Sequence, residues 1–245
     1  MKNAEFLFPE LCNLFGDSYN MTYFQRCAPE DVRLIKTNHK SVPAFARERV
    51  DLIYIGSMFE SKQQIALKAL MPYKERIREL IDDDVVFMVT GNAIELFGNE
   101  IVDADEHIEA LGLFDFTSVR YMDRDRHNSQ FVGTYNGLKM IGHRSQFSFS
   151  YGEFDHPFIE IEKGIGMNPE TKKEGLHIHN FYATYSLGPF LILNPLFTKE
   201  LLVKTGLPGD LCFEKEILEA YEDRLADLEA NMQEDGIFKA ERKHN

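Results

Sequence analysis

The chain has 245 residues, 44% of them hydrophobic, and a formal net charge of −13. This length and apolar fraction suffice for a substantial core, in one large α/β domain or two small ones. The excess of acid argues against nucleic acid and anionic membrane surfaces as partners, because both require a surface rich in Lys and Arg.

In the first half of the chain, short apolar runs alternate with helical patterns, which is typical of βαβ units and a parallel sheet. Pro72 predicts a kink or a division within the longest helical pattern. The expected strands cover residues 4–8, 32–37, 52–55 and 85–89, and the expected helices cover residues 20–26 and 62–81.

The second half changes to short strands separated by Gly and Asn turns, of which Asn136-Gly137 predicts a β-hairpin. Its last helix carries an apolar stripe that could pack against a second subunit. We find no internal repeat or long linker, so we expect one domain over residues 1–245. The expected strands cover 119–121, 131–135, 139–142, 147–150, 158–161 and 176–182, and the helices 195–205 and 213–231.

The sequence also indicates a compartment. No segment approaches the roughly 20 apolar residues of a membrane span, and the first residues lack the long apolar core of a signal peptide. The three cysteines, Cys12, Cys27 and Cys212, have no metal-type spacing and are interpreted as reduced, inert thiols. We therefore expect a cytoplasmic protein.

A glycine follows the fourth expected strand at the point where the chain turns into a helical segment. The run Val89-Thr90-Gly91-Asn92 has the shape of a nucleophile elbow, whose strained turn exposes one reactive side chain above the sheet. Holding another residue type in that conformation costs on the order of 1–3 kcal/mol, whereas glycine adopts it freely. The sequence predicts an elbow with Gly91 at its apex and therefore without a nucleophile.

Four segments, in chain order, carry a recognisable signature. They are Leu-Cys-Asn-Leu-Phe-Gly-Asp-Ser-Tyr-Asn at 11–20, Asp-Leu-Ile-Tyr-Ile-Gly at 51–56 with Gln63 following, Gly-Asn-Ala-Ile-Glu-Leu-Phe-Gly at 91–98, and Asn-Phe-Tyr-Ala-Thr-Tyr-Ser-Leu-Gly-Pro at 180–189. Up to about the helix after Pro195, the chain resembles class I glutamine amidotransferases of the cobyric acid synthase type, which include the stand-alone subunit of lipid II isoglutaminyl synthase. The resemblance implies a three-layer, flavodoxin-like α/β fold with a mixed sheet and a β-hairpin extension.

The resemblance also locates an active site that lacks its reactive groups. Gly91 stands where the family has its nucleophilic cysteine, and Leu187 where it has the histidine base. Glu95 replaces a glutamine, while Ser57 and Met58 replace glycines of the oxyanion loop. Amide hydrolysis by this route needs a thiolate and a base, and losing either typically costs on the order of 10⁶-fold. We expect no catalytic residue, no metal and no cofactor, and the degenerate pocket positions are Gly56, Ser57, Gly91, Asn92, His143, Tyr185 and Leu187.

The leading hypothesis is a catalytically degenerate amidotransferase-like protein, retained for binding, regulation or docking. By resemblance its partner would be an ATP-dependent synthetase that amidates corrin or cell-wall precursors. With glycine and leucine in place of the thiol and imidazole, the pocket is expected to be roomier and able to hold another small ligand. Two alternatives stay open: an active amidotransferase with relocated catalytic residues, and a structural homo-oligomer.

Other candidate residues have ordinary structural interpretations. Thr90 could stand at the apex in a shifted register, but a threonine nucleophile needs an adjacent base. His177 and His179 could begin a zinc site with His156 or Asp155, although a solvated strand face is favoured. An ordinary structural hydrogen bond is favoured for His143. The cluster Arg120, Asp123, Arg124, Asp125, Arg126 and His127 could grip a partner, although alternating charges favour an exposed, self-satisfied hairpin.

Overall fold

The computed structural model describes residues 1–237. Strands made largely of consecutive buried residues form its central six-stranded sheet. Its strand order is β13-β14-β4-β3-β1-β2, and every neighbouring pair is parallel except β13 with β14. This is the expected flavodoxin-like order with one antiparallel edge strand added. The strands are β1 (Lys2–Leu7), β2 (Val32–Thr37), β3 (Leu52–Ile55), β4 (Val86–Thr90), β13 (Leu176–Ile178) and β14 (Phe181–Thr184).

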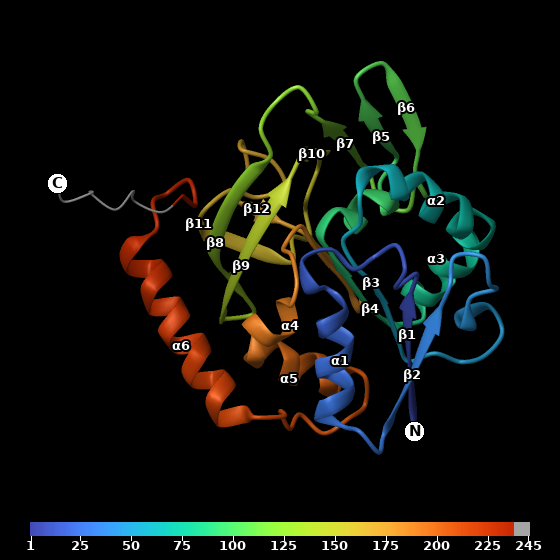
Figure 1. Cartoon of the computed structure of the whole chain (residues 1–245), viewed down its shortest axis with the longest axis horizontal. Helices are drawn as coiled ribbons and strands as arrows, with labels where there is room; N and C mark the ends of the chain where they lie inside the picture. Colours follow the sequence, from blue (N-terminus) through green and yellow to red (C-terminus); the bar gives the residue numbers. More distant parts are fainter. Residues whose placement is uncertain (238–245) are drawn as a thin grey trace.

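Helices lie on both sides of this sheet. Figure 1 shows α1 (Ser18–Cys27), α4 (Phe190–Leu193) and α5 (Pro195–Lys204) together on one side. The other side carries α2 (Glu60–Leu70) and α3 (Lys74–Asp82). Pro72 lies between α2 and α3 in the short 3-10 helix η3 (Met71–Tyr73), so the predicted division of the long helical pattern is confirmed. Two further 3-10 helices are η1 (Leu14–Gly16) and η2 (Ala44–Ala46).

The second half of the chain forms two four-stranded sheets, with orders β10-β7-β5-β6 and β12-β11-β8-β9. In the hairpin of β8 and β9, Asn136 and Gly137 both have positive φ, 48° and 79°, as a type I′ turn requires. The long helix α6 (Glu214–Asn231) packs on this hairpin. The strands are β5 (Glu100–Asp103), β6 (Glu106–Glu109), β7 (Phe116–Arg120), β8 (His127–Tyr135), β9 (Leu138–Gln146), β10 (Ser148–Gly152), β11 (Ile159–Lys163) and β12 (Lys173–Glu174).

Two details of the expected elements are wrong. The single strand expected over 176–182 is the antiparallel pair β13 and β14, because His179, at φ 54°, turns the chain between them. The expected elbow helix is a 3-10 helix, η4 (Gly91–Phe97). Among residues 1–237, no helix has both the length and the apolar character that a membrane span requires.

Candidate functional site

A buried carboxylate ties together the loops at the carboxyl edge of the central sheet. Asp17 is fully buried, and its Oδ2 accepts hydrogen bonds from the Ser57 N–H (2.5 Å) and the Thr90 hydroxyl (3.1 Å). These donors follow β3 and end β4, so one side chain joins the segments after β1, β3 and β4. Burial raises the pKa of Asp17, and the bonds from Ser57 and Thr90 oppose that rise.

Two neighbouring residues extend this polar cluster. The Tyr54 hydroxyl contacts the Thr90 hydroxyl at 2.8 Å and accepts a bond from the Asn20 amide at 2.9 Å. The Asn20 Oδ1 accepts from the Leu191 N–H at 2.9 Å. The motif at residues 11–20 thus positions the site, because Asp17 anchors the strand ends and Asn20 anchors the start of α4.

Gly91 occupies the apex of an elbow. It has φ +61° and directly follows β4, so its conformation is one that side chains rarely adopt. A Cβ at this position would lie 2.5 Å from the Ser57 Cβ and 3.2 Å from a Leu187 methyl carbon. Thr90 has extended geometry and a buried, hydrogen-bonded hydroxyl, which excludes the shifted register.

The amides of the loop after β3 are also occupied. The Met58 N–H donates to the Asn92 Oδ1 at 3.0 Å, and the Asn92 amide donates back to the Met58 carbonyl at 2.8 Å. The Ser57 N–H is held by Asp17. An oxyanion hole needs backbone donors aimed at an empty position where charge develops. Here both donors of the loop are engaged by side chains of the protein.

Side chains fill the space above the elbow. The cavity there has a volume of about 10 Å³, which is room for about one water molecule. The expectation of a roomier pocket is wrong, because Ser57 and Leu187 occupy the volume next to Gly91. The cavity is lined by Leu14, Phe15, Ser57, Met58, Glu60, Asn92, Glu95, Arg126, Ser145, Gln146, Phe147, Ser148, Tyr185 and Leu187.

A buried acid borders this small cavity. Burial raises the pKa of Glu95 from an ordinary 4.5 to about 7, although a bond from Gln63 and the charge of Arg120 oppose the rise. The Gln63 amide donates to Glu95 at 2.9 Å, and the Tyr185 hydroxyl donates to it at 3.3 Å. Arg120 in turn donates to Gln63 and, at 2.8 Å, to Asp103.

The charge cluster that begins at the last residue of β7 faces the site in part. Arg120 is buried in the Glu95 network, and the Arg126 guanidinium lies over the rings of Phe147 (4.5 Å) and Phe15 (6.0 Å) at the edge of the cavity. The expectation of a wholly exposed hairpin is therefore wrong for these two arginines. The alternating charges of this segment predicted exposure, so nothing in the sequence signalled that these two arginines point inward.

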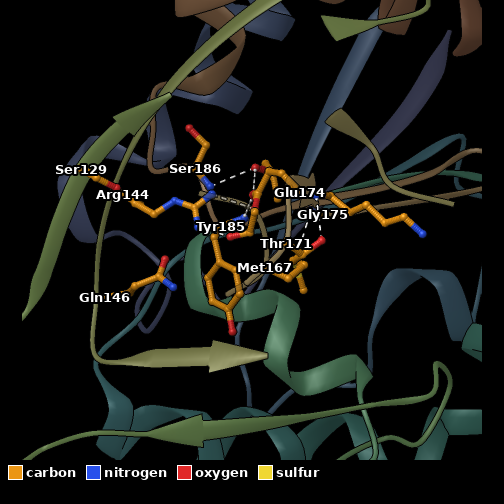
Figure 2. Close-up of polar contacts among 12 residues, drawn as sticks. Ser129, Arg144, Gln146, Met167, Thr171, Glu174, Gly175, Tyr185 and Ser186 are labelled. Atoms are coloured by element: carbon orange, nitrogen blue, oxygen red, sulfur yellow. Dashed lines mark hydrogen bonds and ion pairs between the residues drawn. The ribbon is translucent and has the colours of Figure 1, made fainter. Parts of the chain in front are cut away.

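A buried ion pair supports the segment that leads to Leu187. Figure 2 shows Arg144 reaching Glu174, which lies beside the backbone of Tyr185. Glu174 accepts bonds from Arg144 (2.7 Å), the Thr184 hydroxyl (2.9 Å) and the Tyr185 N–H (2.8 Å). Neither charge reaches solvent. No sequence pattern signalled Glu174, because β12 has only two residues.

The structure brings together most of the predicted pocket positions. Ser57, Asn92, Tyr185 and Leu187 line the cavity, Gly91 contacts two of them, and Gly56 lies behind it against Asp17. The His143 side chain lines a different cavity, under α6, although its carbonyl accepts from the Leu187 N–H at 2.9 Å.

The remaining candidates take structural roles. Cys12 is fully buried, which raises the pKa of its thiol and opposes thiolate formation. His177 stacks on Tyr182, and His179 lies 3.3 Å from an Asp84 carboxylate oxygen, so the two histidines do not share a face. Over residues 1–237 there is no group of three or more metal-type ligands.

Comparison with known proteins identifies the family of this chain. Residues 6–194 match the sequence model of the CobB/CobQ-like glutamine amidotransferase domain. Lipid II isoglutaminyl synthase (glutamine-hydrolyzing) subunit GatD of Staphylococcus aureus is 27% identical over 206 residues, covering 80% of this chain and 82% of that protein. The subunit of the same name from Streptococcus pneumoniae is 28% identical over 239 residues, 90% of each chain.

A solved glutamine amidotransferase structure shares the fold. It superposes with a TM-score of 0.56 at 12% identity, covering 83% of this chain and 100% of the other. The class I amidotransferase fold expected from the sequence is thus confirmed.

The close fit of Gly91 against Ser57 predicts a strong coupling between the two positions. Gly91→Ala should lower the free energy of unfolding by about 2 kcal/mol or more, from the positive φ and the contact with the Ser57 Cβ. Adding Ser57→Gly should recover about 1 kcal/mol of that loss. Urea unfolding of the four proteins in this double-mutant cycle measures the coupling, and strictly additive effects would contradict the contact.

Glu95 predicts a pH dependence of stability. Its pKa rises from 4.5 to about 7 on folding, so between these values only the folded state keeps the proton. Glu95 should therefore contribute a fall of about 3 kcal/mol in the free energy of unfolding as the pH rises from 4.5 to 7, and this contribution should then level off. In Glu95→Gln this fall should be absent. Unfolding curves across that pH range test this, and parallel pH profiles for the two proteins would refute the buried acid.

Proposed function

The chain belongs to the CobB/CobQ-like glutamine amidotransferase family, and we propose that it is a member without glutamine hydrolysis that binds or regulates a synthetase-type partner. Its active relatives suggest the setting, since two of them are named as subunits of lipid II isoglutaminyl synthase. Amidation of a cell-wall precursor is therefore the favoured context, and of a corrin precursor the second. One domain and a cytoplasmic location remain predictions of the sequence.

The observation that supports this proposal is the packing of side chains into the space beside Gly91 at the elbow. Gly91 supplies no nucleophile, Leu187 supplies no base, and Ser57 stands where a cysteine side chain would project. The Asn92 Oδ1 also accepts the hydrogen bond of the Met58 N–H. These replacements fit one another sterically, which supports a site adapted to the absence of substrate rather than one with relocated chemistry.

Retention of the scaffold supports a binding role. The Asp17 cluster and the Arg144–Glu174 pair still fix the loops around the elbow, although no reaction there needs that precision. A surface that a partner recognises needs the same loops in fixed positions. A subunit that docks a synthetase without supplying ammonia would preserve these anchors and lose the reactive groups, as this chain does.

The direct test is glutamine hydrolysis by the purified chain, alone and with any synthetase-type ligase encoded beside it. We expect no turnover, because neither thiol nor imidazole faces the cavity. A rate above about 0.1 per second, a tenth of the low end of typical enzymes, would overturn the proposal and favour the alternative of an active amidotransferase. Co-purification with the ligase is the expected binding result, and symmetric self-association without ligase binding would favour the structural homo-oligomer.

The matched control restores the family pattern at the filled positions. Gly91→Cys with Leu187→His does not suffice, since the new side chain would meet Ser57 and the Met58 amide would stay capped. The control therefore combines Ser57→Gly, Gly91→Cys, Asn92→Gly and Leu187→His. Hydrolysis by this variant, in the assay where the natural chain shows none, would confirm that these positions alone account for the loss.

A further inference from the structure

Two cysteines that lie 185 residues apart in the sequence meet in the fold. Cys27 is the last residue of α1, and Cys212 lies in the segment just before α6. The Cys212 N–H donates a hydrogen bond to the Cys27 Sγ at 3.4 Å. Figure 1 shows the segment before α6 passing the C-terminal end of α1. The fold therefore brings two thiols to one place.

The distance between these two residues suits a disulfide. Because an N–Cα bond is about 1.5 Å long, the Cys212 Cα lies no more than about 5 Å from the Cys27 sulfur. Cys27 ends a helix and Cys212 lies outside any helix or strand, so both side chains have room to change rotamer. Such rotations can bring the two sulfurs to the bonded distance of about 2.05 Å.

Tyr23 holds the two segments together beside the thiols. It lies one turn before Cys27 in α1, and its hydroxyl donates to the Cys212 carbonyl at 3.0 Å. Burial raises the pKa of Tyr23, and the negative charges of a Cys27 thiolate and a Cys212 thiolate raise it further. Both sulfurs therefore lie near the same hydroxyl. The two thiols are positioned before any bond joins them.

The third cysteine does not compete with this pair. Cys12 is fully buried, whereas Cys27 and Cys212 are each partly exposed. Cys12 also precedes the start of α1 and lies near Asp17. The ten residues of α1 span about 15 Å, so the helix separates Cys12 from Cys27. A small oxidant can thus reach the pair, and Cys12 is an internal control.

We propose that Cys27 and Cys212 form a reversible disulfide when the chain meets a low-molecular-weight disulfide such as oxidised glutathione. One cysteine thiolate attacks a glutathione sulfur, forms a mixed disulfide and releases one glutathione thiolate. The second cysteine thiolate attacks the protein sulfur of that mixed disulfide and releases the other glutathione thiolate. Two cysteine thiols are oxidised to one disulfide, oxidised glutathione is reduced to two thiols, and the two protons pass to the released thiolates.

The bond would join α1 to the segment that carries α6. Helix α1 starts at the Asp17 cluster, and α6 packs on the β8–β9 hairpin. In the reduced chain, the Tyr23 hydrogen bond and the ion pair of Lys199 with Glu214 hold the start of α6. A covalent bond at this point also constrains the unfolded chain, because it closes a loop of most of the sequence. Oxidation would therefore set how firmly α6 is held, whether or not the chain hydrolyses glutamine.

The test uses the full reduced chain and oxidised glutathione. Burial raises the pKa of Cys27, and the Cys212 N–H opposes that rise, so the incubation is run at about pH 8, where more thiolate is present. Thiols are then counted in the unfolded chain with N-ethylmaleimide. The count should fall from three to one, and peptide mapping should find Cys27 linked to Cys212. The melting temperature should rise by about 5 °C or more, and dithiothreitol should reverse both changes.

Variants locate the bond. Cys27→Ser and Cys212→Ser should each abolish the linked peptide and the rise in melting temperature. The matched control is Cys12→Ala, which removes the buried thiol, keeps the pair and should form the same bond. Melting of the reduced proteins confirms that each variant is folded. The peptide map of the natural chain, in which Cys12 alone should carry N-ethylmaleimide, gives the same control without a substitution.

Several results would overturn the proposal. These are three free thiols after incubation of the folded chain, a bond that includes Cys12, disulfides only between chains, and glutathione retained on both cysteines without a linked peptide. A linked pair that lowers the melting temperature would equally refute it, because the native fold would then not hold the two cysteines in position for the bond.

Discussion

The arrangement of the site depends on one buried carboxylate, that of Asp17. Parallel strands deliver their loops to one edge of the sheet, but nothing in strand pairing fixes how those loops sit against each other. Asp17 does so by accepting bonds from the loop after β3 and from the end of β4, with Tyr54 and Asn20 completing the cluster. Those donors offset only part of the cost of burying this group, since burial still raises the pKa of Asp17. Removing the cluster would release the elbow from the rest of the edge.

Around this anchor, the replacements at the elbow form a consistent set. Glycine at the apex permits the positive φ, and the absence of a Cβ makes room for Ser57 and Leu187. Asn92 then satisfies both the N–H and the carbonyl of Met58. Under the proposed function, each change would remove one requirement of amide hydrolysis, and the side chains present pack or are hydrogen-bonded in the site. The proposed loss of glutamine hydrolysis is thus compatible with the family's architecture.

Much of the fold could be predicted from the sequence. Periodicity located β2 and β3 at their observed bounds, Pro72 correctly divided the long helix, and the position of Gly91 followed from its place after an apolar strand. These features are local. The turn at His179 was not predicted, because a positive φ at a histidine leaves no clear signal in an apolar stretch.

The polar network around the site was harder to predict, because it depends on contacts distant in sequence. Arg144 meets Glu174 across 30 residues, and Tyr185 meets Glu95 across 90. The collapse of the pocket was also missed. A glycine in place of a larger residue suggests empty space, but close packing of a core draws neighbouring side chains into such a space, and here Ser57 fills it.

The most direct test of the central claim is covalent labelling with an electrophilic glutamine analogue, 6-diazo-5-oxo-L-norleucine. This reagent reports a competent nucleophile beside a glutamine site without requiring turnover. We predict that the intact mass of the chain stays unchanged after incubation, with or without the proposed synthetase-type partner. A stoichiometric adduct on any residue near the elbow would contradict the proposal that this site lacks a nucleophile.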